Sequence, residues 1–144
     1  MLLLDVNPLL YALRADVPDH AAWKAWLEGL LNGDEPFSAC SATLGAVIRI
    51  ATHRKVFKTP TPLSDVLLFI DGVRDAPSFV LLEPGLQHWG LMERLCRVVG
   101  VTGNLVSDAY LAALALEADA ELITADRDFA KFPRLRFRHP LSRG

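Results

Sequence analysis

The chain has 144 residues, of which 51% are hydrophobic and 22% are charged, and its formal net charge is −2. This length supports one domain with a substantial core, and the composition is that of a globular chain rather than a disordered one. The sequence contains no apolar stretch of the roughly 20 residues that a membrane span requires, and its N-terminus lacks the basic segment and cleavage site of a secretory signal. Two cysteines without a CxxC spacing indicate reduced thiols. We therefore expect a single cytoplasmic domain spanning residues 1–144.

Short apolar runs alternate with amphipathic segments along the chain. Apolar runs of this length are typical of buried parallel strands, and they fall at residues 1–5, 37–40, 79–82, 122–125 and 135–137. Helices are predicted at 8–15, 21–32, 42–52, 64–75 and 86–99, then from 105 or 107 to 118, with a helical turn at 128–131. Pro8 suits the first position of a helix, so a helix is predicted to start there, and Asp19 and Ser64 are candidate N-caps. This order predicts an α/β fold with helices on both faces of a mostly parallel sheet.

Three aspartates stand where such a fold would bring them together. Asp5 ends the first strand, Asp126 follows the run 122–125, and Asp108 opens an alanine-rich helix. In open α/β sheets, ligands bind beyond the carboxyl ends of the strands. Converging carboxylates repel one another, and a bound Mg²⁺ or Mn²⁺, which prefers oxygen ligands, offsets that repulsion. The pattern predicts a metal-dependent site for phosphoryl transfer or hydrolysis.

Basic residues gather in two segments. Residues 49–58 contain Arg49, Arg54, Lys55 and Lys58 with His53 and no acid, and residues 126–144 contain six basic and two acidic residues. Basic stripes beside an acidic pocket suit a polyanion whose phosphate the pocket attacks, although ordinary solvated surface charge is the alternative. The four histidines are dispersed without an i, i+4 pair, so the sequence does not favour zinc.

Taken together, these residues resemble the PIN-domain family, specifically the VapC-type toxins of bacterial toxin–antitoxin pairs. The matching segments are LLDVN at 3–7, RIATH at 49–53 with VF at 56–57, GNLVSDAYLAALA at 103–115 and LITADRDF at 122–129. The resemblance covers essentially the whole chain, in order. It implies a PIN-like three-layer α/β/α fold with a central sheet of four to five strands.

The same resemblance implies a function. Such proteins are toxins of type II toxin–antitoxin systems and endoribonucleases dependent on Mg²⁺ or Mn²⁺, which hydrolyse RNA phosphodiester bonds with a metal-activated water. It also implies a homodimer, a VapB-type antitoxin as partner, and a structured tRNA or rRNA as substrate. By motif, Asp5, Asp108 and Asp126 are the catalytic acids and metal ligands, and Asn7 and Asp128 are auxiliary residues.

Each candidate also has a purely structural reading. A turn or helix cap is the ordinary role of an aspartate such as Asp5 or Asp126 after a strand, and Asp108 also suits the dipole of the helix that it opens. Capping explains Asn7 and Asp128 about as well as catalysis does. Among the basic residues, the candidates for binding RNA are Arg49, Arg54, Lys55 and Arg127.

One position departs from the family pattern. The family's second acid, a glutamate three residues before the arginine that aligns with Arg49, is Ala46 here. We therefore expect weaker metal binding, and a PIN-like module that binds RNA or an antitoxin without cutting is an alternative function. A haloacid-dehalogenase-like phosphatase is a further alternative, but it requires an aspartate where this chain has Asn7.

Overall fold

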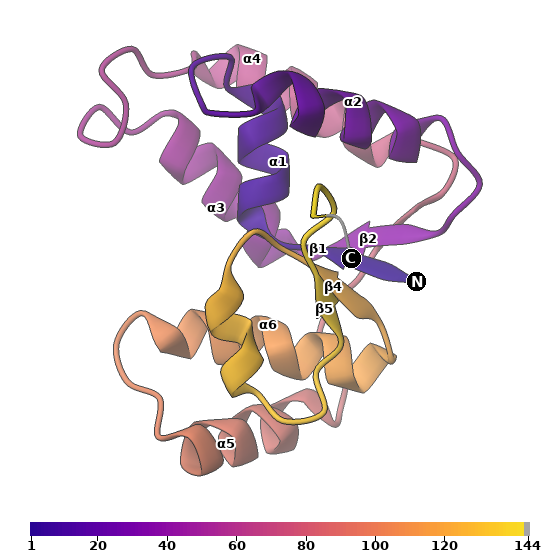
Figure 1. Cartoon of the computed structure of the whole chain (residues 1–144), viewed down its shortest axis with the longest axis vertical. Coiled ribbons are helices and arrows are strands. Elements are labelled where there is room, and N and C mark those ends of the chain that lie inside the picture. Colours follow the sequence, from indigo (N-terminus) through magenta and orange to yellow (C-terminus); the bar gives the residue numbers. More distant parts are fainter. Residues whose placement is uncertain (143–144) are drawn as a thin grey trace.

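The structure, a computed structural model, describes residues 1–142. Within them a five-stranded sheet lies between two layers of helices (Figure 1). The strands are β1 (Leu2–Leu4), β2 (Phe37–Ala39), β3 (Phe79–Leu81), β4 (Glu121–Ile123) and β5 (Phe137–Arg138). The helices are α1 (Val6–Leu13), α2 (His20–Leu31), α3 (Ser41–Ala51), α4 (Leu63–Arg74), α5 (His88–Val99) and α6 (Leu105–Ala118), with a 3₁₀ helix η1 (Arg127–Lys131).

The strand order is β3-β2-β1-β4-β5, and every neighbouring pair is parallel. From β1 the chain moves outward to β2 and β3, and then returns to the other side of β1 to form β4 and β5. The direction of winding therefore reverses between β1 and β4. In open parallel sheets, this reversal opens a crevice at the carboxyl ends of the two strands.

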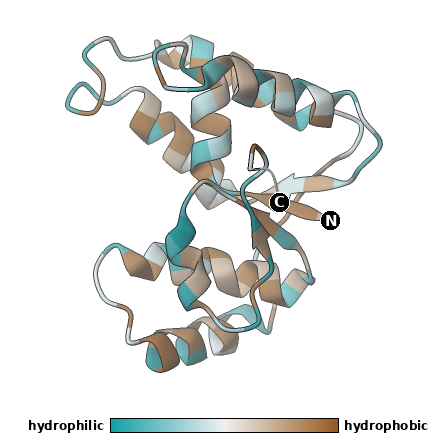
Figure 2. Cartoon of the chain, viewed as in Figure 1, coloured by the Kyte–Doolittle hydropathy of each residue, from teal (hydrophilic) through white to brown (hydrophobic). Residues whose placement is uncertain are grey.

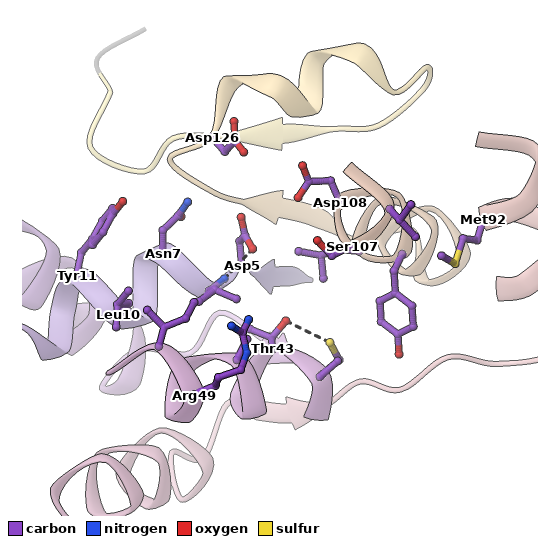
Figure 3. Close-up of a pocket in the computed structure, with 18 residues that line it drawn as sticks. Asp5, Asn7, Leu10, Tyr11, Thr43, Arg49, Met92, Ser107, Asp108 and Asp126 are labelled. Carbon is purple, nitrogen blue, oxygen red and sulfur yellow. Dashed lines mark hydrogen bonds between the residues drawn. The ribbon is translucent and has the colours of Figure 1, made fainter. Parts of the chain in front are cut away.

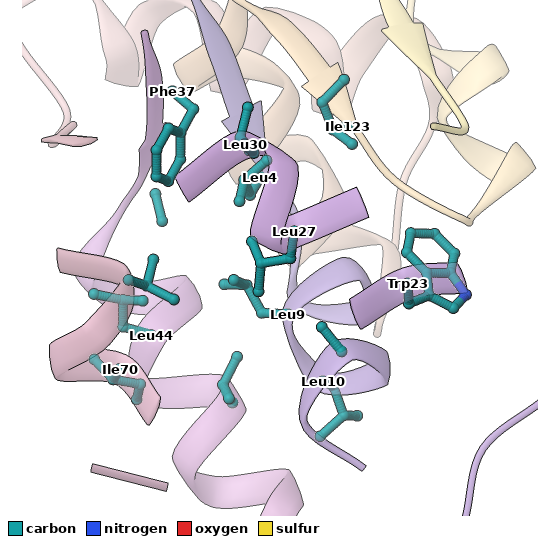
Figure 4. Close-up of a cluster of buried hydrophobic side chains, with 14 of the residues drawn as sticks. Leu4, Leu9, Leu10, Trp23, Leu27, Leu30, Phe37, Leu44, Ile70 and Ile123 are labelled. Atoms are coloured by element: carbon teal, nitrogen blue, oxygen red, sulfur yellow. The ribbon is translucent and has the colours of Figure 1, made fainter. Parts of the chain in front are cut away.

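Two hydrophobic cores flank the sheet, because successive side chains of a strand point to opposite faces. Leu2 and Leu4 of β1 pack into the core covered by α1 to α4 (Figure 4), whereas Leu3 packs into the core formed with α5 and α6. All three leucines of β1 are buried. Figure 2 shows β1 hydrophobic along its length, in contrast to the hydrophilic η1. A strand that is buried on both faces has a continuous apolar sequence, and residues 2–4 follow this pattern.

The predicted fold class is confirmed, with all strands parallel rather than mostly parallel. Two predicted helix starts are wrong, those of α1 and α4, whereas Asp19 does stand at the N-cap position of α2 although its side chain does not cap it. Helix α1 begins at Val6, because the Asp5 side chain caps it, so Pro8 lies inside the first turn. Asp19 has a left-handed backbone (φ 60°) and makes no capping bond from its side chain. Helix α4 follows Pro62, so Ser64 lies inside the helix rather than capping it.

Other sequence features also have a place in the fold. Trp23 is buried in the core and makes edge contacts with Tyr11 and Trp26, of which Trp26 is partly buried. Cys40 is buried, Cys96 is half-buried, and both are free thiols. Among the described residues, no helix combines the length and the apolar character that crossing a bilayer demands.

Candidate active site

The site begins where β1 and β4 end side by side. Leu4 pairs with Ile123, and the backbone N–H of Asp5 donates to the carbonyl of Ile123 at 2.9 Å. Thr124, which follows β4 directly, is buried, and its hydroxyl donates to Oδ2 of Asp5 at 2.7 Å. The same hydroxyl accepts the backbone N–H of Asp126 at 3.0 Å. Thr124 thus ties the two acidic strand ends together.

The second oxygen of Asp5 caps helix α1, since Oδ1 accepts the backbone N–H of Val6 at 2.7 Å. Burial raises the pKa of Asp5, the hydrogen bonds from Thr124 and Val6 act against this rise, and the charge of Asp126 adds to it. The structural reading of Asp5 as a cap is therefore correct. The carboxylate of Asp5 thus caps α1 and also lines the site.

Asn7 and Asp126 shape the turn that follows β4. Oδ1 of Asn7 accepts the backbone N–H of Ala125 at 2.9 Å, so Asn7 pins the turn instead of capping α1. Oδ1 of Asp126 accepts the backbone N–H of Asp128 at 2.8 Å and caps η1. The cap of η1 is therefore Asp126 and not Asp128. These bonds hold the Asp126 carboxylate in a defined position beside Asp5.

Asp108 lies in the first turn of α6 and is half-buried. Its pKa is raised to about 6, mainly by burial and then by the charges of Asp126, Asp5 and Asp128, whereas the charge of Lys131 lowers it. This mutual effect requires the carboxylates to be near one another. The structure thus brings together three acids that lie far apart in the sequence.

These acids line one cleft of about 730 Å³ between the two helical layers. Figure 3 shows Asp5, Asp108 and Asp126 around the same space, with Arg49 of α3 on the opposite wall. The predicted residues that line the cleft are Asp5, Asn7, Ala46, Arg49, Asp108 and Asp126. Helix α3 contributes Thr43, Ala46 and Arg49 at intervals of three, which places all three on one face. Ala46 therefore borders the cleft, as the motif alignment expects.

Four predicted residues lie outside the lining of the cleft. Arg54 and Lys55 are exposed on the loop after α3, and Arg127 and Asp128 are exposed at the start of η1. Asp128 lies 4.0 Å from Nζ of Lys131. Its charge still reaches the site, because it contributes to the raised pKa of Asp108.

The carboxylates of the cleft suit a divalent cation that keeps part of its water shell better than one whose ligands all come from the protein. Within residues 1–142, no three aspartate, glutamate, histidine or cysteine side chains form a compact group ready to hold a metal. The donors at the cleft are nonetheless carboxylate oxygens of Asp5, Asp108 and Asp126, whose concentrated negative charge favours a cation. Mg²⁺ binds such sites through one or two carboxylates and keeps several waters.

Sequence reasoning missed the role of Thr124. The available signal is a hydroxyl residue two positions before the acid that follows a strand, in the order TAD at 124–126. It also missed Lys131, whose positive charge acts on Asp108. Lys131 gave no signal beyond its place in a basic segment.

An open parallel sheet with three carboxylates near its switch point defines an α/β protein with an acidic cleft. Comparison with known proteins narrows this class. The model of the PIN domain matches residues 2–135. The VapC ribonuclease Mb2897 of Mycobacterium bovis is 45% identical over 141 residues, which cover 98% of this chain and 96% of that protein. Ribonuclease VapC25 of Mycobacterium tuberculosis is 36% identical over 140 residues, which cover 97% of this chain and 99% of that protein.

Solved structures show the same fold at low sequence identity. VapBC2 from Rickettsia felis, bound to a DNA fragment from its promoter, has a chain with a TM-score of 0.68 at 16% identity, covering 95% of this chain and 96% of that one. VapC20 of Mycobacterium tuberculosis, described as a Sarcin-Ricin loop cleaving toxin, has a TM-score of 0.64 at 15% identity. The match covers 94% of this chain and 99% of that one. The present chain belongs to the PIN-domain family and, within it, to the VapC ribonucleases. The family predicted from the sequence motifs is thereby confirmed.

Proposed function

We propose that this protein is the toxin of a type II toxin–antitoxin pair and an endoribonuclease that depends on Mg²⁺ or Mn²⁺. The observation that carries the proposal is the convergence of Asp5, Asp108 and Asp126 on one cleft at the switch point of the sheet. Membership of a family whose curated relatives are named ribonucleases supports the reaction class. Oxygen donors and excess negative charge support the choice of a hard divalent cation.

In this proposal, Asp5, Asp108 and Asp126 hold the cation. The cation would supply Lewis-acid chemistry, in which a bound water loses a proton more easily and the charge of a phosphoryl oxygen is offset. The Thr124 hydroxyl keeps the carboxylate of Asp5 and the backbone of Asp126 in fixed positions, so that the site needs little rearrangement on binding. Asn7 holds the turn between them through its bond to the backbone of residue 125.

Basic side chains position the RNA. Arg49 lines the cleft, where its guanidinium can hold the oxygens of a phosphate near the acids. Arg54, Lys55 and Arg127 are exposed on segments around the cleft, and we assign them to phosphates on either side of the cut. The substrate in this proposal is a structured tRNA or rRNA with an unpaired loop, since RNA loops expose bases and backbone to proteins.

The proposed partners are a second copy of this chain and a VapB-type antitoxin. Solved structures with this fold include VapBC complexes, which supports the antitoxin at the level of the fold. We expect the antitoxin to place an arginine in the acidic cleft, because a guanidinium can bridge two carboxylates. A complex in which Asp5, Asp108 and Asp126 stay open to solvent contradicts this part of the proposal.

The test is RNA cleavage by the purified protein with Mn²⁺ or Mg²⁺ and with EDTA. Cleavage should require the metal, leave 5′-phosphate and 3′-hydroxyl ends, and be lost in Asp108→Asn and Asp126→Asn. Asp71→Asn is a matched control, because Asp71 is an exposed aspartate of α4 outside the cleft. Cyclic phosphate ends, or activity that persists in EDTA, contradict the proposal.

A second candidate is a PIN-like module that binds RNA or an antitoxin without cutting. Ala46 favours it, because a residue without charge lines the cleft where the family carries an acid. The same assay separates the two functions. A binding module retains affinity for RNA or for the antitoxin and shows no metal-dependent turnover.

A further inference from the structure

Arg14 is a buried arginine at the end of helix α1, with 7% of its surface exposed. Its Nη1 donates to the carbonyl of Thr59 at 2.7 Å and to the hydroxyl of Thr61 at 3.1 Å. Its Nε donates to Asp16 at 3.0 Å, and Nη2 donates to the second oxygen of the same carboxylate. Its Cζ also lies 3.8 Å from the centre of the Phe57 ring. A single guanidinium therefore makes contacts in three directions.

Three of these contacts are with residues 52–62, which connect α3 to α4 and which we name the basic loop. The loop contains neither helix nor strand, and its other fixed points include the bond from the N–H of Thr61 to the carbonyl of Ala51 at 2.9 Å. Burying a guanidinium is costly unless its donors are satisfied, so Arg14 strongly favours the one loop conformation that satisfies them. Lysine has neither the planar fork nor the flat face that these contacts use.

The basic loop carries a concentrated positive charge. His53, Arg54, Lys55 and Lys58 are all exposed, and the loop contains no acidic residue. The contacts of Arg14 fall on the second half of the loop, from Phe57 to Thr61, and leave these side chains free to face solvent. Arg14 thus secures the loop without using its exposed cations.

The loop continues the wall of the active-site cleft. On α1, Tyr11 lines the cleft one turn before Arg14, and on α3, Arg49 lines it one turn before His53. In Figure 1 the loop projects beyond the end of α3, on the side that faces away from the chain termini. A polyanion with one phosphate at the acids can therefore follow the α3 wall outward and meet the loop.

We propose that Arg14 is a positioning residue that holds the basic loop as a phosphate-binding arm for single-stranded RNA beside the cleft. The inference rests on the proposed function and adds to it a residue that touches neither the acids nor the RNA. Preorganised cations bind phosphates with a smaller loss of conformational entropy than mobile ones. Arg14 therefore acts on the binding of RNA, and the reacting groups at Asp5, Asp108 and Asp126 are unaffected by it.

The first experiment measures binding without cleavage. A short fluorescein-labelled single-stranded RNA is titrated by anisotropy against Asp108→Asn protein in EDTA, with and without a second change at Arg14. Arg14→Met and Arg14→Lys should each weaken RNA binding about three- to tenfold. Added salt should reduce the difference in RNA affinity between these variants and the protein with Arg14. Arg97→Met is the matched control, since Arg97 also pairs with a carboxylate but is exposed on α5. Unchanged affinity in both Arg14 variants, with the fold retained, overturns the inference.

A double-mutant cycle separates positioning from general stability. The loop is neutralised by Arg54→Gln, Lys55→Gln and Lys58→Gln, and Arg14→Lys is then added. If Arg14 acts through the loop cations, its effect on RNA affinity should nearly vanish in this background. An equal loss in both backgrounds overturns the inference, because Arg14 would then act elsewhere. Arg14→Lys also carries the test where Arg14→Met does not fold.

Kinetics with the metal-loaded protein complete the test. Arg14→Lys should raise KM several-fold and leave kcat within about twofold, the signature of lost binding without lost chemistry. A lower kcat at unchanged KM contradicts the inference.

Two outcomes separate this inference from the proposed function. If the wild type binds RNA through the loop but does not cleave it, the proposed function alone is refuted. If cleavage does not depend on the loop or on Arg14, only this inference is refuted. Loop variants that lose antitoxin affinity but keep RNA affinity assign the arm to a protein partner and overturn the RNA role.

Discussion

Replacing Asp108 by asparagine should stabilise the metal-free protein at neutral pH. The native state holds the proton of Asp108 with a pKa of about 6, against an ordinary value of 3.8. The cause is burial, followed by the charges of Asp126, Asp5 and Asp128. Because the folded state binds this proton more tightly than the unfolded state, raising the pH from about 4 to about 6 removes stability, and above that range the full penalty is present. Asparagine cannot ionise and escapes the penalty.

The size of the effect follows from the two pKa values. A pKa of about 6 against 3.8 corresponds to roughly 3 kcal/mol if the shift is felt in full. Asp108 is only half-buried, and solvent screens part of the repulsion, so we expect about 1 to 1.5 kcal/mol. For a chain of this size, that gain raises Tm by about 3 to 5 °C.

The assay is urea or thermal unfolding in EDTA, followed from pH 4 to pH 8. Asp108→Asn should be more stable than the wild type at pH 7.5, and the gap should close as the pH falls toward 4. Asp71→Asn, the exposed control on α4, should stay within about 0.5 kcal/mol of the wild type throughout. Saturating Mn²⁺ should favour the wild type instead, because a ligand that binds only the native state stabilises it.

A variant that is equally or less stable than the wild type at pH 7.5 refutes this reasoning. So does a stability gap that does not depend on pH, because the effect would then come from packing or hydrogen bonding rather than from charge. Either result would mean that burial and the neighbouring charges do not raise the pKa of Asp108 as described.

Two further expectations concern the same site, and a third concerns the oligomeric state. Ala46→Glu adds an oxygen ligand to the cleft wall and should tighten Mn²⁺ binding in calorimetry. Gly45→Glu, at the exposed neighbouring position, is the control and should leave Mn²⁺ binding unchanged. Weaker Mn²⁺ binding by Ala46→Glu with a retained fold would show that residue 46 faces elsewhere. Thr124→Val removes the hydroxyl shared by Asp5 and Asp126 and should lower the free energy of unfolding by about 1 to 3 kcal/mol in urea titrations, and no loss would mean that water replaces the hydroxyl. Sedimentation at micromolar concentration should give a homodimer, and a monomer would remove the second copy from the proposed assembly.

The sequence alone was sufficient to predict the architecture and the meeting of the three acids in one cleft. Leu2, Leu3 and Leu4 form a short apolar run, and such a run is a strand buried on both faces wherever helices cover both sides of a sheet. The alternation of strands and helices then makes the sheet parallel, so the ends that carry Asp5 and Asp126 lie at one edge. Local pattern and chain order were enough, because both properties depend on neighbours in the sequence.

Helix boundaries were less predictable, since several residues competed for one role. Asn7 and Pro8 together indicated a helix start at residue 8, yet Asp5 caps α1 and the helix begins at Val6. Which residue caps the helix depends on the backbone direction at the end of β1. That direction depends on the pairing of β1 with β4. The sequence contains several residues that could cap this helix, and the geometry of the sheet decides which of them does so.

Only the tertiary structure decided the contacts that join distant segments. The hydroxyl of Thr124 meets Asp5 across 119 positions of sequence, and Arg14 meets Thr59 across 45. The raised pKa of Asp108 likewise exists only after α6 has packed the carboxylate beside two strand ends. These properties depend on sheet register and on burial, and no local pattern encodes either one, because each is a sum over neighbours that the folded chain brings from elsewhere.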